Sequence, residues 1–105
     1  MTEPDVASSD ASNIAATRVT DGDEFILNGR KWWSSGGMSA HCKMAIVMAV
    51  SDLSASRHRQ HSMVLVPLDS PGVAIVRSTS VFGYNDRLHG GHAEIVYDNV
   101  RVPAA

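Results

Sequence analysis

The chain has 105 residues, 44% of them hydrophobic and 19% charged, with a formal net charge of −2. These proportions are typical of one folded domain and exclude a disordered chain. The weak negative charge argues against binding to nucleic acid, and no apolar run approaches the ~20 residues of a membrane helix.

The single cysteine and the polar N-terminus indicate the compartment. Cys42 has no second cysteine with which to form an internal disulfide, which suits a reducing environment. Residues 1–10 lack the basic and apolar parts of a secretory signal peptide. We therefore expect an intracellular protein. Because a polar loop opens the chain and Arg101-Val102-Pro103 nearly ends it, we also expect a module of a larger polypeptide.

Short runs rich in Val, Ile, Thr and Phe follow one another along the chain, and helical spacing is nowhere sustained. They predict seven strands, at residues 13–19, 24–27, 30–34, 43–50, 61–67, 73–78 and 92–97. Many short strands with regular turns favour an all-β fold, a barrel or a sandwich whose edges are hidden. We predict a six- to eight-stranded antiparallel β-barrel.

Turn residues mark the connections between these strands. Asp21-Gly22 predicts a two-residue hairpin turn, and Asn28-Gly29 predicts either a second hairpin or a bulge. Residues 70–72 (Ser-Pro-Gly) form a third tight turn. The basic segment 53–60 is predicted to be a solvated hairpin loop. Residues 83–91 form a long irregular loop, a feature that is often functional.

Two adjacent tryptophans stand beside serines and glycines in residues 31–37, KWWSSGG. Neighbours on a strand point to opposite faces, so one of Trp32 and Trp33 is expected on an outer surface. With Ser34, Ser35 and the polar loop 2–10, an exposed indole could stack on a planar heterocycle. The alternative is one core tryptophan, one interface tryptophan and a serine-rich turn.

Other side chains could carry chemistry but form no recognised motif. The histidine pairs fall short of a zinc pattern and are predicted to be solvated or core residues, so no metal site is predicted. These pairs are His58 with His61 and His89 with His92, and His41 and Cys42 stand apart from them. Four carboxylates could act as bases, but nothing in the sequence pairs or buries them; they are Glu3, Asp10, Asp86 and Glu94. From its residues alone, the chain is expected to hold a ligand without transforming it.

Three motifs, in order and spanning nearly the whole chain, resemble the acyl-CoA dehydrogenase family. Residues 1–10, MTEPDVASSD, resemble the family signature T-E-P-x-x-G-S-D, and residues 27–36, LNGRKWWSSG, are similar to I-N-G-x-K-x-W-I-T-N. Residues 95–103 resemble the strand and turn that end the middle domain. The likeness is closest to the long-chain branch of family members ten and eleven. It implies a β-barrel middle domain over residues 1–105, with the helical N- and C-terminal domains outside the chain.

This resemblance also implies an activity and a set of contacts. Family enzymes oxidise the α,β bond of acyl-CoA thioesters with FAD, pass the electrons to an electron-transferring flavoprotein and form homo-oligomers. The resemblance places Trp33 beside the flavin ring, Ser35 near its N5, Thr2 and Met1 at its pyrimidine edge, and Ser9 at the phosphates and the acyl-CoA substrate. The implied cofactor-binding residues are Met1, Thr2, Ser8, Ser9, Trp33, Ser34 and Ser35. No catalytic residue is implied, because the family's glutamate base lies in the C-terminal domain.

The chain departs from the family pattern in places, and two other functions stay open. Its first loop is one residue longer, so Ser8 and Ser9 could exchange roles, and Ser35 replaces a threonine. Alone, the chain is expected to be inactive and to bind FAD weakly or not at all. The enzyme would be cytoplasmic in a bacterium, and mitochondrial or peroxisomal in a eukaryote. The alternatives are a module that stacks sugar or single-stranded nucleic acid on Trp32 or Trp33, and a self-associating structural piece.

Overall fold

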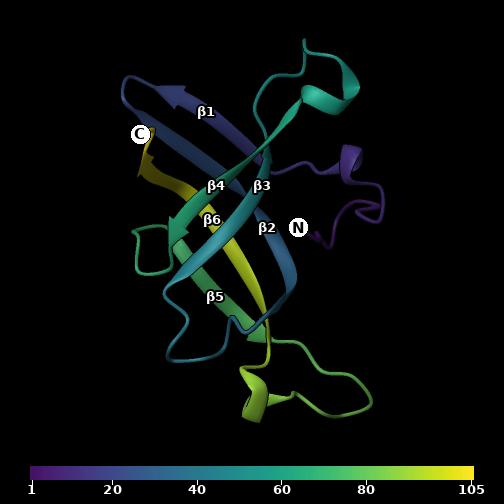
Figure 1. Ribbon diagram of the computed structural model, residues 1–105. Helices are drawn as coiled ribbons and strands as arrows, with labels where there is room; N and C mark the ends of the chain where they lie inside the picture. Colours follow the sequence, from purple (N-terminus) through teal and green to yellow (C-terminus); the bar gives the residue numbers. More distant parts are fainter.

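The computed structural model, which describes residues 1–105, consists of six strands and three short 3-10 turns (Figure 1). The strands are β1 (Thr17–Asp21), β2 (Glu24–Ser35), β3 (Met44–Val50), β4 (His61–Pro67), β5 (Val73–Ser78) and β6 (His92–Pro103). The 3-10 turns are η1 (Ala11–Asn13), η2 (Arg57–Arg59) and η3 (Arg87–His89). None of these helical segments is long and apolar enough to cross a membrane.

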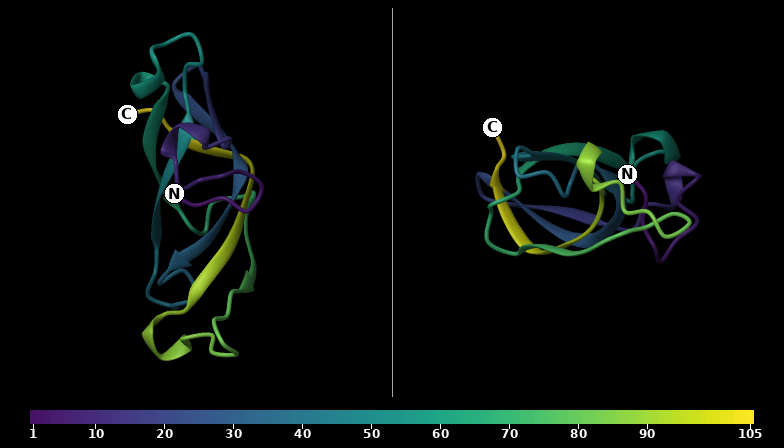
Figure 2. Two further views of the ribbon diagram at one scale, coloured as in Figure 1. Left: turned by 90° about the vertical axis from the view of Figure 1, so that its right-hand side faces the viewer. Right: turned by 90° about the horizontal axis from the view of Figure 1, so that it is seen from below.

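All six strands belong to one sheet, in the order β4-β3-β1-β2-β6-β5. The edge strands β4 and β5 follow each other in the chain and are joined only by residues 68–72. The sheet must therefore curl until its two edges meet at that turn, as the two views in Figure 2 show. The all-β fold is confirmed, with six strands as the lower end of the predicted range. The edges are not joined by a ladder, so the barrel is not closed, and β1 pairs with β3 in parallel.

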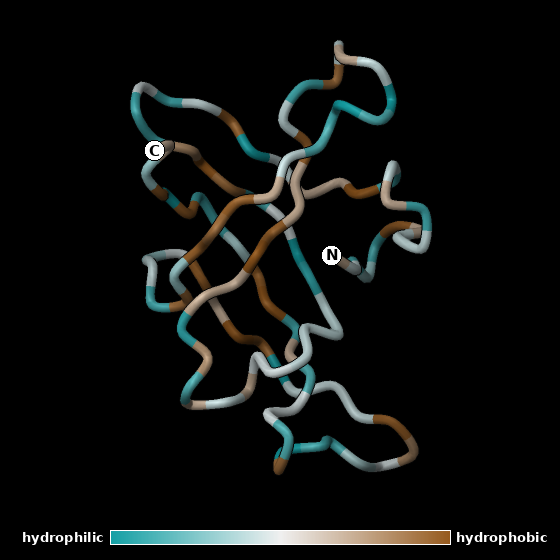
Figure 3. The backbone as a smooth tube through the Cα atoms, viewed as in Figure 1, coloured by the Kyte–Doolittle hydropathy of each residue, from teal (hydrophilic) through white to brown (hydrophobic).

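The hydrophobic core fills the inside of the curled sheet. Alternation along β4 buries Val64 and Val66 and leaves Met63 and Leu65 more than half exposed on the outer face. Hydrophobic positions gather on the crossing strands in the middle of the molecule (Figure 3). The main core cluster consists of Leu27, Val47, Val64, Val66, Ala93, Ile95, Tyr97, Val100 and Val102.

Two predicted strands, 24–27 and 30–34, form the single strand β2, with a bulge between them. Its pairing with β6 shifts register between Leu27 and Gly29, so Asn28-Gly29 forms the bulge and not a hairpin. Asn28 stabilises it, because its Oδ1 accepts a hydrogen bond from the Asn99 backbone N–H at 2.8 Å. β6 in turn continues to Pro103, beyond the predicted end at residue 97.

The first strand and the first turn also differ from prediction. β1 begins at Thr17 and not at residue 13, because Asp10 caps a 3-10 turn over residues 11–13. The β1–β2 hairpin is confirmed, but Asp21 pairs with Glu24, so the central residues are Gly22-Asp23. Only Gly22 has a positive φ, +62°, as expected for glycine in the first central position of a type II′ turn.

Candidate functional site

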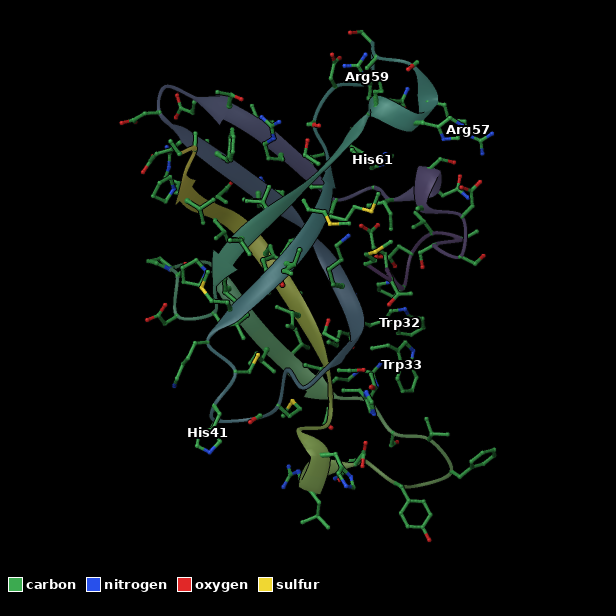
Figure 4. All side chains as sticks on the ribbon, viewed as in Figure 1. Trp32, Trp33, His41, Arg57, Arg59 and His61 are labelled. Carbon is green, nitrogen blue, oxygen red and sulfur yellow. The ribbon has the colours of Figure 1, made fainter.

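The two tryptophans lie at a second bulge in β2. Its pairing with β6 shifts between Lys31 and Ser34, and Trp33 has a φ of +52°, which is rare for a large side chain. The strand alternation is broken here, so both indoles lie on the same side (Figure 4), with ring centroids 6.1 Å apart. The expectation that they point to opposite faces is wrong. The expectation of one surface indole is confirmed, since Trp33 is 37% exposed.

The N-terminal segment takes the place of a partner strand at this bulge. The backbone N–H of Trp32 donates to the Thr2 carbonyl at 3.1 Å, and the Thr2 hydroxyl donates to the Trp32 carbonyl at 2.9 Å. The bulge that carries Trp33 is therefore bonded, through the backbone of its neighbour Trp32, to the predicted N-terminal contact Thr2.

A cavity of about 350 Å³ opens beside Trp33. It brings together four of the seven predicted cofactor contacts, which are Met1, Trp33, Ser34 and Ser35. Core residues Val47, Ile95 and Tyr97 also line it. Burial raises the pKa of Tyr97 to about 12, with a smaller contribution from Cys42, so its phenol is neutral at neutral pH. The cavity thus combines an aromatic surface, hydroxyls and an apolar lining, as ligand sites commonly do.

The other three predicted contacts, Thr2, Ser8 and Ser9, lie in the N-terminal segment and do not line this cavity. The Ser8 hydroxyl accepts from the Glu3 N–H at 3.1 Å and donates to the Glu3 carbonyl at 3.4 Å, so it is engaged within the loop. Ser9 is exposed and makes no side-chain hydrogen bond within the chain. The two serines are therefore not equivalent, and Ser9 is the one free to contact a ligand.

A buried ion pair holds the N-terminal segment on the sheet. Lys31 Nζ lies 2.6 Å from Glu3 Oε1 and donates to the Met48 carbonyl at 2.7 Å. The same carboxylate accepts from the N–H groups of Ala15 at 2.9 Å and Ala16 at 3.0 Å. Burial by itself would raise the pKa of Glu3, but Lys31 and these two amides together lower it. Burial lowers the pKa of Lys31.

On the other side of the bulge, a chain of hydrogen bonds begins at Ser35. Its Oγ lies 2.9 Å from His92 Nδ1, and His92 Nε2 lies 3.3 Å from Asp86 Oδ2. The other carboxylate oxygen of Asp86 lies 2.7 Å from His89 Nδ1. The His92 ring also packs against Trp33, with centroids 6.1 Å apart. Sequence reasoning treated His92 as a solvated or core residue, because its partners are recognisable only once β2 and β6 are paired.

The four carboxylates for which the sequence offered no partner are all paired. Glu94 is fully buried and contacts both Arg30, at 2.6 Å from the arginine Nε, and Arg77. Asp10 accepts from Arg57 at 2.8 Å. Most of these partners are tens of residues away along the chain, which is why local patterns did not reveal them. The structure contains no group of three or more His, Cys, Asp or Glu side chains that could hold a metal ion.

Comparison with known proteins shows extensive similarity. The family model described as acyl-CoA dehydrogenase, middle domain, matches residues 1–100. Acyl-CoA dehydrogenase family member 11 of Mus musculus is 58% identical over 106 residues, which cover 100% of this chain and 14% of that protein.

Solved structures show the same likeness. A structure from Mycobacterium abscessus, assigned to the acyl-CoA dehydrogenases, superposes with a TM-score of 0.94 and 53% identity, covering 98% of this chain and 25% of its own. The crystal structure of acyl-CoA dehydrogenase from Geobacillus kaustophilus gives 0.82 and 36%, covering 99% and 26%. The chain therefore spans between 14% and 26% of the length of these relatives.

Proposed function

The chain belongs to the acyl-CoA dehydrogenase family, whose middle domain it matches, and we propose that it forms the flavin-facing side of an FAD-dependent acyl-CoA dehydrogenase. The observation that carries this proposal is the exposed Trp33 indole beside the hydroxyls of Ser34 and Ser35, all lining one cavity. A flat aromatic surface flanked by hydrogen-bonding groups suits a planar, polar-edged ring.

The residues around the bulge fit the flavin ring in different ways. The positive φ of Trp33 turns its indole out of the strand alternation, where it can stack on a ring face. Ser35 presents its hydroxyl near the position proposed for flavin N5. The Thr2 hydroxyl already donates to the Trp32 carbonyl, so its lone pairs are left to accept from a ring N–H at the pyrimidine edge, beside the Met1 backbone. Ser34, on the same cavity, completes this set.

The N-terminal loop provides the proposed contact to the rest of the cofactor. Because Ser8 is engaged with the Glu3 backbone, we assign the phosphates of FAD and the acyl-CoA chain to the exposed Ser9. This choice removes the exchange of roles that the longer loop allowed.

Bound FAD would accept the two electrons released when the α,β bond of an acyl-CoA thioester is oxidised. The residues of this chain orient the ring and exclude water from one of its faces. We assign none of these residues to the removal of the substrate proton. That role is proposed for a glutamate base outside the chain. The isolated chain is accordingly proposed to be inactive and to bind FAD weakly, because one side of a site recovers little of the entropy lost on binding.

The full-length protein is proposed to have the partners and location expected for such an enzyme. It would oxidise an acyl-CoA substrate, pass electrons to an electron-transferring flavoprotein and form a homo-oligomer. Its compartment would be the bacterial cytoplasm, or the mitochondrion or peroxisome in a eukaryote. Flavin fluorescence of the isolated chain titrated with FAD tests the fragment proposal, which micromolar binding or thioester oxidation would contradict.

The role of Trp33 is tested by Trp33→Gly in the full-length protein. Glycine removes the indole and tolerates the positive φ, so the fold should persist while FAD affinity falls roughly tenfold to a hundredfold, as expected for a lost stacking contact. Phe82→Gly is the matched control, because Phe82 is also an exposed aromatic residue, with a φ of +50°. Unchanged FAD affinity in Trp33→Gly would refute the proposal.

A further inference from the structure

His92 stands between two cavities and contacts both proposed ring-facing side chains. Ser35 and Trp33 line the cavity of about 350 Å³ beside the bulge. His92 lines a second cavity of about 600 Å³, bounded mainly by residues 81–89. The Ser35–His92 hydrogen bond of 2.9 Å therefore joins the proposed flavin site to the loop 81–89.

The backbone holds His92 and Asp86 in place. The Thr79 N–H and hydroxyl both donate to the His92 carbonyl, each at 2.8 Å, and Thr79 is 2% exposed. The Gly91 N–H donates to the Asp86 carbonyl at 2.9 Å, while the Gly91 carbonyl accepts from Gly36 at 2.9 Å. Three backbone hydrogen bonds and one from the Thr79 hydroxyl thus anchor the main chain at Asp86, Gly91 and His92, and the His92 ring lies between Ser35 and Asp86.

The protonation state of His92 determines whether the Ser35 hydroxyl donates or accepts the hydrogen bond between them. When His92 is neutral and carries its proton on Nε2, facing Asp86, Nδ1 is an acceptor and Ser35 must donate to it. The Ser35 lone pairs then face the cavity. When His92 is protonated by solvent, Nδ1–H donates to Ser35 Oγ, and the hydroxyl proton is free to be donated into the cavity.

We propose that His92, oriented by Asp86, is a positioning residue that switches Ser35 between accepting from and donating to the flavin ring. The inference rests on the proposed function. A flavin ring presents a hydrogen-bond acceptor at N5 when oxidised and a donor there when reduced. Protonated His92 therefore suits the oxidised ring, and neutral His92 suits the reduced ring.

The charges that face His92 allow this switch. The carboxylate of Asp86 contacts it directly, and His89 shares that carboxylate. Hydrogen bonding from His89, and to a smaller extent from His92, lowers the pKa of Asp86, so the carboxylate is ionised where imidazoles exchange protons. Arg87 and Tyr84 line the same cavity. The contacts of His92 from β2 and from the residue that follows β5, which are Trp33, Ser35 and Thr79, carry no charge.

The first experiment determines, in the absence of flavin, which ring nitrogen of His92 carries the proton. In full-length protein with ¹⁵N-labelled histidine rings, with His92→Gln used to assign the signal, neutral His92 should carry its proton on Nε2. Asp86→Asn should reduce that preference, because the amide can also donate to Nε2. A proton on Nδ1 in the neutral wild-type protein would overturn the inference.

The second experiment measures the affinity of oxidised and reduced FAD at about pH 6 and about pH 8. The ratio of the two affinities should change roughly threefold to tenfold in the wild type, the worth of one hydrogen bond. The change should vanish in His92→Gln and persist in His89→Gln, which leaves the Ser35 contact intact. FAD binding with the same pH dependence in His92→Gln would overturn this inference alone. Absence of FAD binding in the wild type would overturn the proposed function as well.

Discussion

Lys31 and Ser35 lie on opposite sides of the tryptophan bulge, and their surroundings differ in kind. Lys31 and its partner Glu3 expose only 3% and 4% of their side chains. Ser35 bonds to His92, which in turn meets Asp86, and these two expose 29% and 44% of their side chains. One side of the proposed site is thus an enclosed ion pair, while the other is a partly exposed chain of hydrogen bonds.

This difference means that one side of the bulge is rigid, while the other side can change its hydrogen bonds. A buried charge must keep all its partners, because leaving it unpaired costs several kcal/mol. The Glu3–Lys31 pair therefore fixes the N-terminal segment, including Thr2, in one position. Exposed groups exchange partners with water at little cost, so the Ser35 hydroxyl can reverse its bonding without disturbing the fold. Four predictions test this contrast, each measured by hydrogen–deuterium exchange of the full-length protein.

The largest effect is expected from Glu3→Gln, which leaves the Lys31 charge buried without its partner. The free energy of opening the N-terminal segment should fall by about 3–5 kcal/mol. The change should appear as faster exchange in the peptide that contains Ala15 and Ala16, whose N–H groups donate hydrogen bonds to Glu3. Glu24→Gln, at an exposed pair with Arg101, is the control and should change stability far less, because exposed ion pairs contribute little. Equal effects in the two variants would contradict the contrast.

Gly29→Ala should be the next most damaging. A Cβ on Gly29 would lie 2.4 Å from Ala16 Cβ and 2.9 Å from Ala16 Cα, so the docked N-terminal segment would have to move. Overpacking of this kind costs about 1–3 kcal/mol. Gly83→Ala is the control, since it has a φ of +81° but no atom within 4 Å of the added Cβ. If Gly83→Ala is the more destabilising variant, the close approach of Ala16 is unimportant.

Acidification should loosen the enclosed side. The pKa of Glu3 is lower in the folded protein than its ordinary value of 4.5. The stability that this carboxylate contributes is therefore complete above about pH 4.5 and is lost as the pH falls through the lowered value. The expected slope is up to about 1.4 kcal/mol per pH unit for this one group. Hydrogen exchange of the peptide that contains Ala15 and Ala16 should show this pH dependence in the wild type, and the dependence should be weaker in Glu3→Gln.

The smallest effect is expected from His89→Gln on the exposed side. The His89–Asp86 pair exposes 80% and 44% of its side chains, and such exposed pairs contribute little to stability. Hydrogen exchange in residues 83–91 should therefore change only slightly, with no change in the N-terminal peptide. A loss comparable to that of Glu3→Gln would mean that both sides of the bulge are equally rigid.

Local patterns in the sequence predicted the strands well, since alternation and turn residues act over a few positions. This reasoning predicted the ends of β4 and, to within one residue, those of β3, and it offered a bulge at Asn28-Gly29 as one of two possibilities. The second bulge was not, because nothing in KWWSSGG shows that residues 31–35 lose register with β6. The partners of Glu3 and Glu94 were missed for the same reason.

The sequence alone determined the fold class and, through its motifs, the family, because periodicity and turn chemistry are local and the motifs are contiguous. Only the tertiary structure decided that both indoles share one side, that Ser9 and not Ser8 is free, and that His92 joins Ser35 to Asp86. The physical reason is that a hydrogen bond or an ion pair depends on distances of about 3 Å, and strand pairing sets those distances between residues far apart in the chain.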